Sequence, residues 1–566
     1  MRTATEDYQA RRTMKKNKIY IAATLLLAGW TNGQAQVQVQ DTTLNRTVVV
    51  EQEYAPDIMS ASKINVLPQV EAPTATKHTV EYDASLRPAT YIPATAMPSY
   101  MGKETQPEPL PGYLRFGYGN NGNLDVYANY LFLLSERDKL NINFSLNGMD
   151  GELDLPDGAE TWNSYHYRTR ASLDYTHRFK AVDLKAEGNF GLSYFNLLYG
   201  KQRFTSGDVR LGIVATDKNL PVQFQAETAL MYYDHSYNRQ DASLNEIYIR
   251  TQGELYIPIK KGGQAGMAFR MNNLFYDYAQ KPLAATKEND QTSYTTVDLN
   301  PYYQTGSDKW SLHLGVRADL ASKGKNNFLF APDVLMTFTT GKNSKIYIRA
   351  EGGRHLNDFR RLEQIAPYAP IYNAYFTSSY EQLNAAAGFK WGTDLGFKMH
   401  LYGGYRIMKD ELTPYLTETV GGEPWKGHAL QQADTKNFYT GAELGYDYKD
   451  IFSLQGSLLY RSWEEDELYF YFLPEMVLDL HADVRPITGL QFRLGYQGIT
   501  RRGSGLINDG KKAPAVGNLY FNGHYDLFHN LGIYVRAENL LDKEYQYYWG
   551  YPAQGLNFLG GLTFRF

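Results

Sequence analysis

The sequence predicts an all-β protein: a transmembrane antiparallel β-barrel of about 22 strands, preceded by a short proline-rich segment. Three observations lead to this fold class. The final residues alternate between apolar and polar side chains, turn-forming residues recur from residue 112 to the end, and an export signal comes first. The 566 residues also exceed what one ordinary soluble core would need. We therefore expect one large barrel over residues 112–566.

The N-terminus has the three parts of a secretory signal peptide. Basic residues follow Met14, residues 19–30 are mainly apolar, and Gly33 and Ala35 offer the small side chains that a signal peptidase reads. This apolar stretch is too short to cross a membrane as a helix. We assign residues 1–35 to the signal peptide and expect translation to start at Met14, because residues 1–13 are polar.

Residues 36–111 form a segment of different composition. Nine prolines lie in it, with alanine and threonine between them. Such a composition favours an extended or wrapped chain over a packed domain. The runs most typical of a strand are 47–50 and, less clearly, 63–67. We expect this segment to lie in the periplasm or in the lumen of the barrel.

Beyond residue 112, short turns alternate with longer polar connections, which is the asymmetry of an outer-membrane barrel. Ten short turns are predicted, at 135–139, 178–182, 217–220, 258–263, 306–309, 340–344, 392–395, 448–451, 485–489 and 528–531. Eleven other connections are predicted at 120–122, 149–163, 196–201, 235–245, 278–292, 322–326, 354–377, 409–433, 464–473, 501–515 and 546–554. Together these 21 connections join 22 strands, so both ends of the barrel lie on the periplasmic side.

Strand side chains point alternately to the two faces of a sheet, so a barrel strand should alternate between lipid and a wet lumen. The closing strand places one apolar set on the lipid face: Leu556, Phe558, Gly560, Leu562, Phe564 and Phe566. The predicted lumen face carries both signs of charge, on Arg349, Glu351, Lys398, Arg406, Asp479, Asp483, Arg485, Arg493, Asp526, Arg536, Glu538 and Arg565. Such charges would be costly in a dry sandwich core, and this favours the barrel.

Composition agrees with the barrel and excludes several other classes. The chain has 47 tyrosines and 27 phenylalanines, but a mean hydropathy of only −0.48. Aromatic rings at the two lipid boundaries and a polar lumen produce this combination. A net charge of −4 argues against nucleic-acid binding. The absence of cysteine excludes disulfides, thiolate metal sites and cysteine nucleophiles.

The C-terminal residues resemble the end of a TonB-dependent receptor barrel. The run Asn-Leu-Leu-Asp-Lys-Glu-Tyr at 539–545, the Gly-Tyr-Pro at 550–552 and the closing strand 560–566 carry the resemblance. It implies a 22-strand barrel in the cell outer membrane, contact with lipids and lipopolysaccharide, and a transport function. Within residues 36–111, Thr47, Val48, Val49 and Val50 are similar to the energy-coupling box of that family.

The chain also departs from this family. Its members carry a plug domain of well over a hundred residues between the box and the first strand, whereas about sixty proline-rich residues follow Glu51 here. We therefore expect a receptor-like barrel without a standard plug. An ordinary extended segment explains the three valines equally well, so coupling to TonB stays an open alternative.

Two features could carry chemistry. Asp479, His481 and Asp483 lie on one lumen stripe and are either two metal ligands with help from a neighbour or part of a mixed-charge wall. The connection 354–377 could bind a ligand, fold inward as a constriction, dock a partner, or form a surface loop with a short helix. No nucleophile-elbow motif occurs, so we expect no enzyme, and we expect no cofactor.

Two functions follow from these expectations. The first is transport of a small solute across the outer membrane, with TonB or a surface lipoprotein as a partner. The second is a structural or assembly subunit of an outer-membrane complex, in which opposite lumen charges close the barrel on itself. The mixed signs of the lumen residues leave the choice open.

Overall fold

The computed structural model describes residues 110–155, 161–198, 200–237, 242–259, 262–278, 293–323, 327–369, 378–420, 423–464, 473–501, 515–548 and 550–566. The predicted signal peptide 1–35 lies outside the described residues. So does the proline-rich segment 36–111 apart from its last two residues, and with it the predicted coupling box Thr47–Val50. The signal peptide, the proline-rich segment and the coupling box therefore stay predictions.

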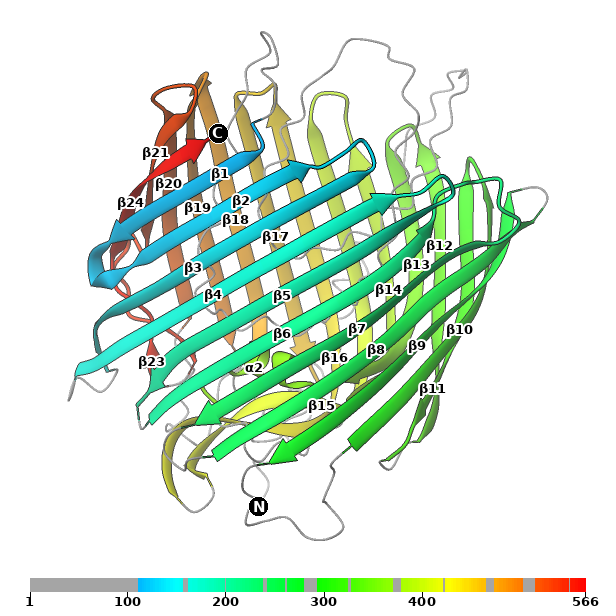
Figure 1. Cartoon of the computed structure of the whole chain (residues 1–566), viewed down its shortest axis with the longest axis horizontal. Helices are drawn as coiled ribbons and strands as arrows, with labels where there is room; N and C mark the ends of the chain where they lie inside the picture. The colour runs from blue at the N-terminus through cyan, green and yellow to red at the C-terminus, as the bar shows by residue number, and fades with distance from the viewer. Residues whose placement is uncertain are drawn as a thin grey trace, which may run out of the picture. The chain divides into compact units, whose positions relative to one another are not determined.

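The described chain forms a closed antiparallel barrel of 22 strands, as the sequence predicts, and a separate two-stranded hairpin (Figure 1). The first half of the barrel comprises β1 Gly112–Gly119, β2 Leu124–Leu133, β3 Asp138–Asp154, β4 Thr161–Arg178, β5 Val182–Leu197, β6 Gly200–Ala215, β7 Gln223–Tyr237, β8 Ala242–Ile259, β9 Gly263–Tyr278, β10 Ser293–Ser307 and β11 Trp310–Ala321. The second half comprises β12 Phe328–Gly341, β13 Ser344–Leu356, β14 Ser378–Gly392, β15 Phe397–Val420, β16 Glu423–Tyr448, β17 Phe452–Trp463, β18 Pro474–Ile487, β19 Leu490–Arg501, β20 Val516–Asp526, β21 Leu531–Glu538 and β24 Asn557–Arg565.

The barrel closes where its first strand meets its last. Strand β1 pairs with β24 from Tyr113 opposite Arg565 to Gly119 opposite Leu559, and on its other side it pairs with β2. Gly112 and Phe566 exchange backbone hydrogen bonds at this seam. Closure leaves no sheet edge without backbone partners, which a membrane-spanning sheet requires.

The alternation of side chains along the strands sets the two faces, as the closing strand shows. Phe558 and Leu562 are 55% and 52% exposed on the outer face, whereas Asn557 and Thr563 are 5% and 2% exposed on the lumen face. The same parity holds on β18, where Leu480 is exposed while His481 and Asp483 are buried. The predicted lipid and lumen faces of these strands are confirmed.

Each of the ten predicted short turns joins two strands of the barrel. They lie at the end that carries both Gly112 and Phe566, and the longer connections lie at the opposite end, which outer-membrane barrels expose to the outside. We call this opposite end the mouth.

One connection differs in kind from the prediction. Most of 409–433 is strand and not loop, because β15 and β16 continue to pair with each other up to Val420 opposite Glu423. Threonine, valine and leucine favour this extended ribbon, although polar residues and two prolines among them concealed it in the sequence.

The helical elements are short. In the part of the chain that the structure describes, they are the 3-10 turn η1, Asn120–Gly122, and the helix α2, Phe359–Ile365. Among the described residues, no helix is long and apolar enough to span a membrane.

Candidate functional site: an inward-folded segment at the mouth

The described residues that follow β13, in its connection to β14, turn inward at the mouth. We call the described part of this connection, residues 357–369, the mouth segment; it contains α2 (Figure 1). Its contacts reach β6, which lies seven strands from β13 around the ring of 22, and the hairpin next to β24, which lies eight strands from β14. Diametrically opposite strands would be eleven apart. The segment therefore crosses the lumen, as one of the four alternatives for 354–377 predicted.

The first turn of α2 is fixed by two carboxylates. Asp358 is the N-cap, and its side chain accepts a hydrogen bond of 3.0 Å from the Arg361 N–H. Glu246 on β8 accepts the Phe359 N–H at 3.2 Å. Both bonds satisfy N–H groups that a helix start leaves without partners. Burial raises the pKa of Asp358, and the Arg361 N–H bond acts in the opposite direction.

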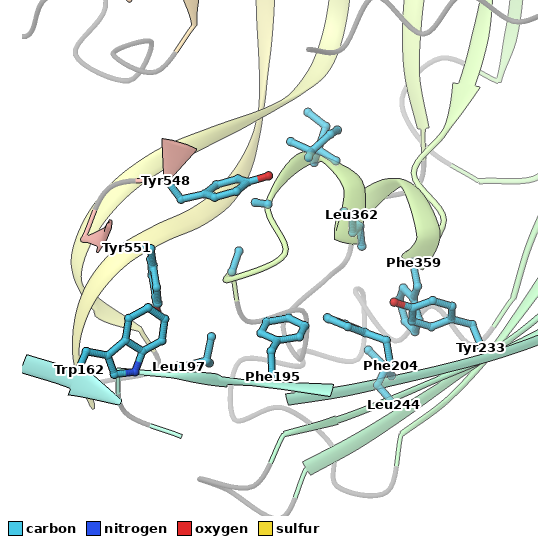
Figure 2. Packing of buried hydrophobic residues seen from close by; sticks show 14 of the residues in the cluster. Trp162, Phe195, Leu197, Phe204, Tyr233, Leu244, Phe359, Leu362, Tyr548 and Tyr551 are labelled. Carbon is cyan, nitrogen blue, oxygen red and sulfur yellow. The ribbon is translucent and has the colours of Figure 1, made fainter. Parts of the chain in front are cut away.

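An apolar cluster holds the mouth segment against the barrel wall (Figure 2). Phe359 and Leu362 of α2 are 1% and 0% exposed. The Phe359 ring meets Tyr233 of β7 and Tyr276 of β9 edge-on or tilted, with centroids 5.7 and 5.4 Å apart. The cluster draws on six successive wall strands, through Met149, Leu153, Trp162, Phe195, Leu197, Phe204, Tyr233 and Leu244.

The hairpin between β21 and β24 meets the mouth segment from the other side. It consists of β22, Gln546–Tyr548, and β23, Tyr551–Pro552. Tyr551 stacks on Tyr368 and also meets Trp162 edge-on, at 5.4 Å. Arg501 of β19 fixes the hairpin by donating hydrogen bonds of 3.0 Å to the carbonyls of Gln546 and Tyr547. Burial raises the pKa of Tyr368 to about 12.

The β15–β16 ribbon supplies the third inward contact. Leu412 of β15 is buried in the same apolar cluster, and Leu430 of β16 packs against it. The Gln432 side chain donates hydrogen bonds to the carbonyls of Ser378 and Asp410, which ties the base of the ribbon to β14. Three connections therefore share one cluster at the mouth.

The polar side of α2 faces charged wall residues. Arg360 donates a hydrogen bond of 3.2 Å to Asp208 on β6, and Asp208 also pairs with Arg210 at 3.1 Å. Glu363 accepts a hydrogen bond of 2.9 Å from the Tyr233 hydroxyl and lies 4.0 Å from both Arg168 and Arg170 on β4. Sequence reasoning did not find these pairs, because nothing in the local sequence relates 360–363 to strands so far away.

Opposite charges on the lumen wall pair with each other; the sequence predicted that both signs share this face but left their pairing open. Arg493 pairs with Asp483 at 2.8 Å. Asp125 of β2 binds both Arg115 and Arg536, each at 2.8 Å, and so connects strands on the two sides of the closing seam. The other pairs of the predicted set are Arg349–Glu351, Lys398–Asp447, Arg406 with Glu381 and Glu411, and Arg565–Asp526.

The three residues of the possible metal site, Asp479, His481 and Asp483, take part in two separate interactions. His481 lies 3.3 Å from Asp479, while Asp483 is held by Arg493. Within the described residues, no three His, Asp or Glu side chains are placed to share a metal ion. The stripe is therefore part of a mixed-charge wall.

A cavity of about 130 Å³, lined by several charged side chains, lies against the lumen wall along β5 to β11. Lys185, Arg210, Arg270 and Arg317 line it together with Glu187, Glu227, Glu254 and Asp298. Its lining thus combines four cationic and four acidic side chains. Arg210 and Glu187 connect this cavity to the charged residues beneath α2.

No family model and no curated protein matches this sequence. Solved structures do match. A ferric enterobactin receptor (PfeA) mutant from Pseudomonas aeruginosa has a TM-score of 0.62 and 10% identity, over 80% of each chain. The copper transporter OprC has a TM-score of 0.61 and 11% identity, also over 80% of each chain. The FrpB iron transporter from Neisseria meningitidis has a TM-score of 0.61 and 9% identity, over 81% of this chain and 82% of its own.

The fold is shared with these large barrels. At such low identity the likeness concerns the fold and not individual residues. A closed barrel of 22 strands with an apolar outer face is the architecture of outer-membrane barrels, and it agrees with the prediction made from the closing strand.

Proposed function

We propose that this receptor-type barrel transports a small polar solute across the outer membrane, and that the mouth segment controls entry to the lumen. The solved structures that share the fold include a copper transporter and an iron transporter. The observation that carries the proposal is the mouth segment itself. It crosses the lumen above a charged cavity, and it is held partly by ion pairs that can exchange with other ligands.

The alternative is a structural or assembly subunit. One observation favours it: the mouth segment, the β22–β23 hairpin and the ribbon share one buried apolar cluster, as the parts of a permanent core would. Paired charges along the wall would stabilise a barrel that never opens. In this alternative the partner is another protein of an outer-membrane complex, and no solute passes.

Conductance in planar lipid bilayers separates the two functions. We would compare the protein starting at residue 36 with a deletion of 36–111 and with Tyr368→Ala in both backgrounds. Transport predicts a closed parent protein that conducts after at least one of these changes. If all four proteins stay silent, transport is overturned and the scaffold is favoured. If the parent conducts, neither the segment 36–111 nor the mouth segment acts as a closure.

We further propose that residues 36–111 replace the usual plug and that Thr47–Val50 pair with TonB. Pairing with a partner strand needs free backbone N–H groups, which proline lacks. Val49→Pro should therefore abolish capture of the full chain by an immobilised periplasmic domain of TonB, while the control Val66→Pro retains it. Equal capture of both variants would exclude the box, and no capture of the parent protein would exclude coupling.

A further inference from the structure

Two arginines of β4 face a single carboxylate of α2. Arg168 and Arg170 are two residues apart on a strand, so their side chains project to the same, lumen face. One Nη2 atom of each lies 4.0 Å from Oε1 of Glu363. A charge-assisted N–H···O bond measures about 2.7–2.9 Å. Both contacts are therefore ion pairs without a hydrogen bond.

The two oxygens of Glu363 are in different situations. Oε2 accepts the Tyr233 hydroxyl at 2.9 Å. Oε1 makes no hydrogen bond to the described residues, although the Glu363 side chain is only 11% exposed. A buried oxygen without a donor costs about 1–3 kcal/mol. Glu363 is thus a weak partner for the two arginines.

The two arginines differ in how firmly their guanidinium groups are held. Arg170 is held in place, because its guanidinium donates to the carbonyls of Thr169 and Leu192 and to the Ser193 hydroxyl, at 2.8, 3.2 and 3.1 Å. Its side chain is nevertheless 42% exposed. Among the described residues, Arg168 has no acid nearer than Glu363. One guanidinium is therefore fixed in orientation while the other is lightly held.

The acids around α2 are unequally shared among the arginines. Asp208 is shared by Arg210 and Arg360, at 3.1 and 3.2 Å, and Glu187 lies 3.6 Å from Arg210. Arg360 also interacts electrostatically with Asp358 and Glu246, so the cluster as a whole has no positive excess. Arg168 and Arg170, by contrast, share Glu363 as their one acidic partner within 4.0 Å among the described residues. The pair on β4 therefore has less negative charge close by than the other two arginines.

We propose that Arg168 and Arg170 bind an oxyanion, the carboxylate or phosphate group of a solute, and that Glu363 occupies their site in its absence. Two guanidiniums on one face can hold an oxyanion by several short hydrogen bonds, which Glu363 does not make. Because Glu363 belongs to α2, anion binding and docking of the mouth segment compete. The anion therefore loosens the segment that crosses the lumen.

This inference rests on the proposed function only in that the anion belongs to a transported solute. Anion binding and the loosening of the mouth segment can both be measured without transport. We would titrate the full chain in detergent micelles with citrate and, separately, with inorganic pyrophosphate by calorimetry. Hydrogen exchange of residues 359–365 would be followed with and without each anion. The variants are Glu363→Gln, Arg168→Gln with Arg170→Gln, and the control Arg203→Gln, whose exposed side chain pairs with Asp234. A difference in migration between the unheated and the boiled protein on a denaturing gel verifies that each variant folds.

Competition predicts that Glu363→Gln binds the anion at least about fivefold more tightly than the parent, a usual coupling magnitude. The double arginine variant should lose binding, Arg203→Gln should bind like the parent, and the anion should speed exchange in α2. Binding of citrate alone would assign a carboxylate, and of pyrophosphate alone a phosphate. An unchanged affinity in Glu363→Gln, retained binding without the two arginines, or no binding in any folded variant would overturn the proposal. If the protein binds the anion and exchange in α2 becomes faster, but no variant conducts, the oxyanion site is supported and transport is excluded.

Discussion

The rings of Tyr368 and Tyr551 lie nearly parallel, with centroids 4.0 Å apart and an interplanar angle of 11°. Tyr368 is the last residue but one of the mouth segment, and Tyr551 belongs to the hairpin before the closing strand. The two connections start from strands eight apart around the ring. Because each ring is fixed by its own connection, the stack joins two sides of the mouth.

We expect Tyr368→Ala and Tyr551→Ala each to loosen the mouth, and the double variant to cost less than the sum of the two single variants. Aromatic pairs contribute about 0.5–1.5 kcal/mol beyond the burial of their area, so the coupling in a double-mutant cycle should fall in that range. Urea unfolding in micelles measures the cycle, and hydrogen exchange of 357–369 measures the loosening.

A suitable control is Tyr303→Ala, because Tyr303 is 41% exposed on the lipid face and far from the mouth cluster. It should leave exchange in 357–369 as in the parent protein. If the changes in the free energy of unfolding of the two single variants add up to that of the double variant, the stack does not couple the two connections.

The N-cap of α2 gives a second prediction. Asp358→Ala removes the acceptor for the Arg361 N–H and should destabilise the helix by about 1 kcal/mol, whereas Asp358→Asn keeps an acceptor and should stay within a few tenths of the parent. Faster hydrogen exchange at 361–365 in the alanine variant alone is the expected readout. Equal exchange in both variants would mean that the apolar cluster holds α2 without its cap.

The barrel could be predicted from the sequence because the alternation of side chains within each strand is enough to determine its two faces. The alternation of Phe558 and Leu562 with Asn557 and Thr563 determines which face meets lipid, whatever the neighbouring strand is. Turn residues then place the strand ends, and an even number of strands closes the ring. These signals are local and recur in every hairpin, so errors in one strand do not spread to the rest.

The mouth could not be predicted in the same way. Glu363 and Arg168 lie on elements whose proximity depends on the curvature of the whole ring. The sequence 354–377 shows aromatic residues and arginine pairs but no period that says whether it turns inward. The lumen charges were predicted as a set, while partners such as Asp125 and Arg536 needed the register across the closing seam.

A buried lumen pair gives a third prediction. Asp483 and Arg493 are 1% and 3% exposed, and two hydrogen bonds of 2.8 and 3.3 Å join them. Asp483→Ala leaves the guanidinium buried without its acid, and such a break costs about 3 kcal/mol. The urea midpoint of the folded barrel should fall accordingly.

The exposed pair of Lys342 and Asp394 is the control, because Asp394→Ala should leave that midpoint unchanged. Similar midpoints for both variants would show that wall pairs do not stabilise the barrel.

The turn between β14 and β15 gives the last prediction. Gly396 has a φ of +92°, and a Cβ there would lie 2.0 Å from the carbonyl oxygen of Asp447 on β16. Backbone cannot yield as a flexible side chain can, so Gly396→Ala should destabilise the barrel by more than about 1 kcal/mol. Gly188 on β5 offers a matched control, since a Cβ at that position has no atom within 4 Å and the residue keeps an ordinary strand conformation. Gly188→Ala should therefore unfold at the parent's urea concentration. If Gly396→Ala also unfolds at the same urea concentration as the parent protein, this turn can shift freely. The short-turn end of the barrel would then be less rigid than the backbone hydrogen bonds of Gly396 with Thr393 and Asp447 imply.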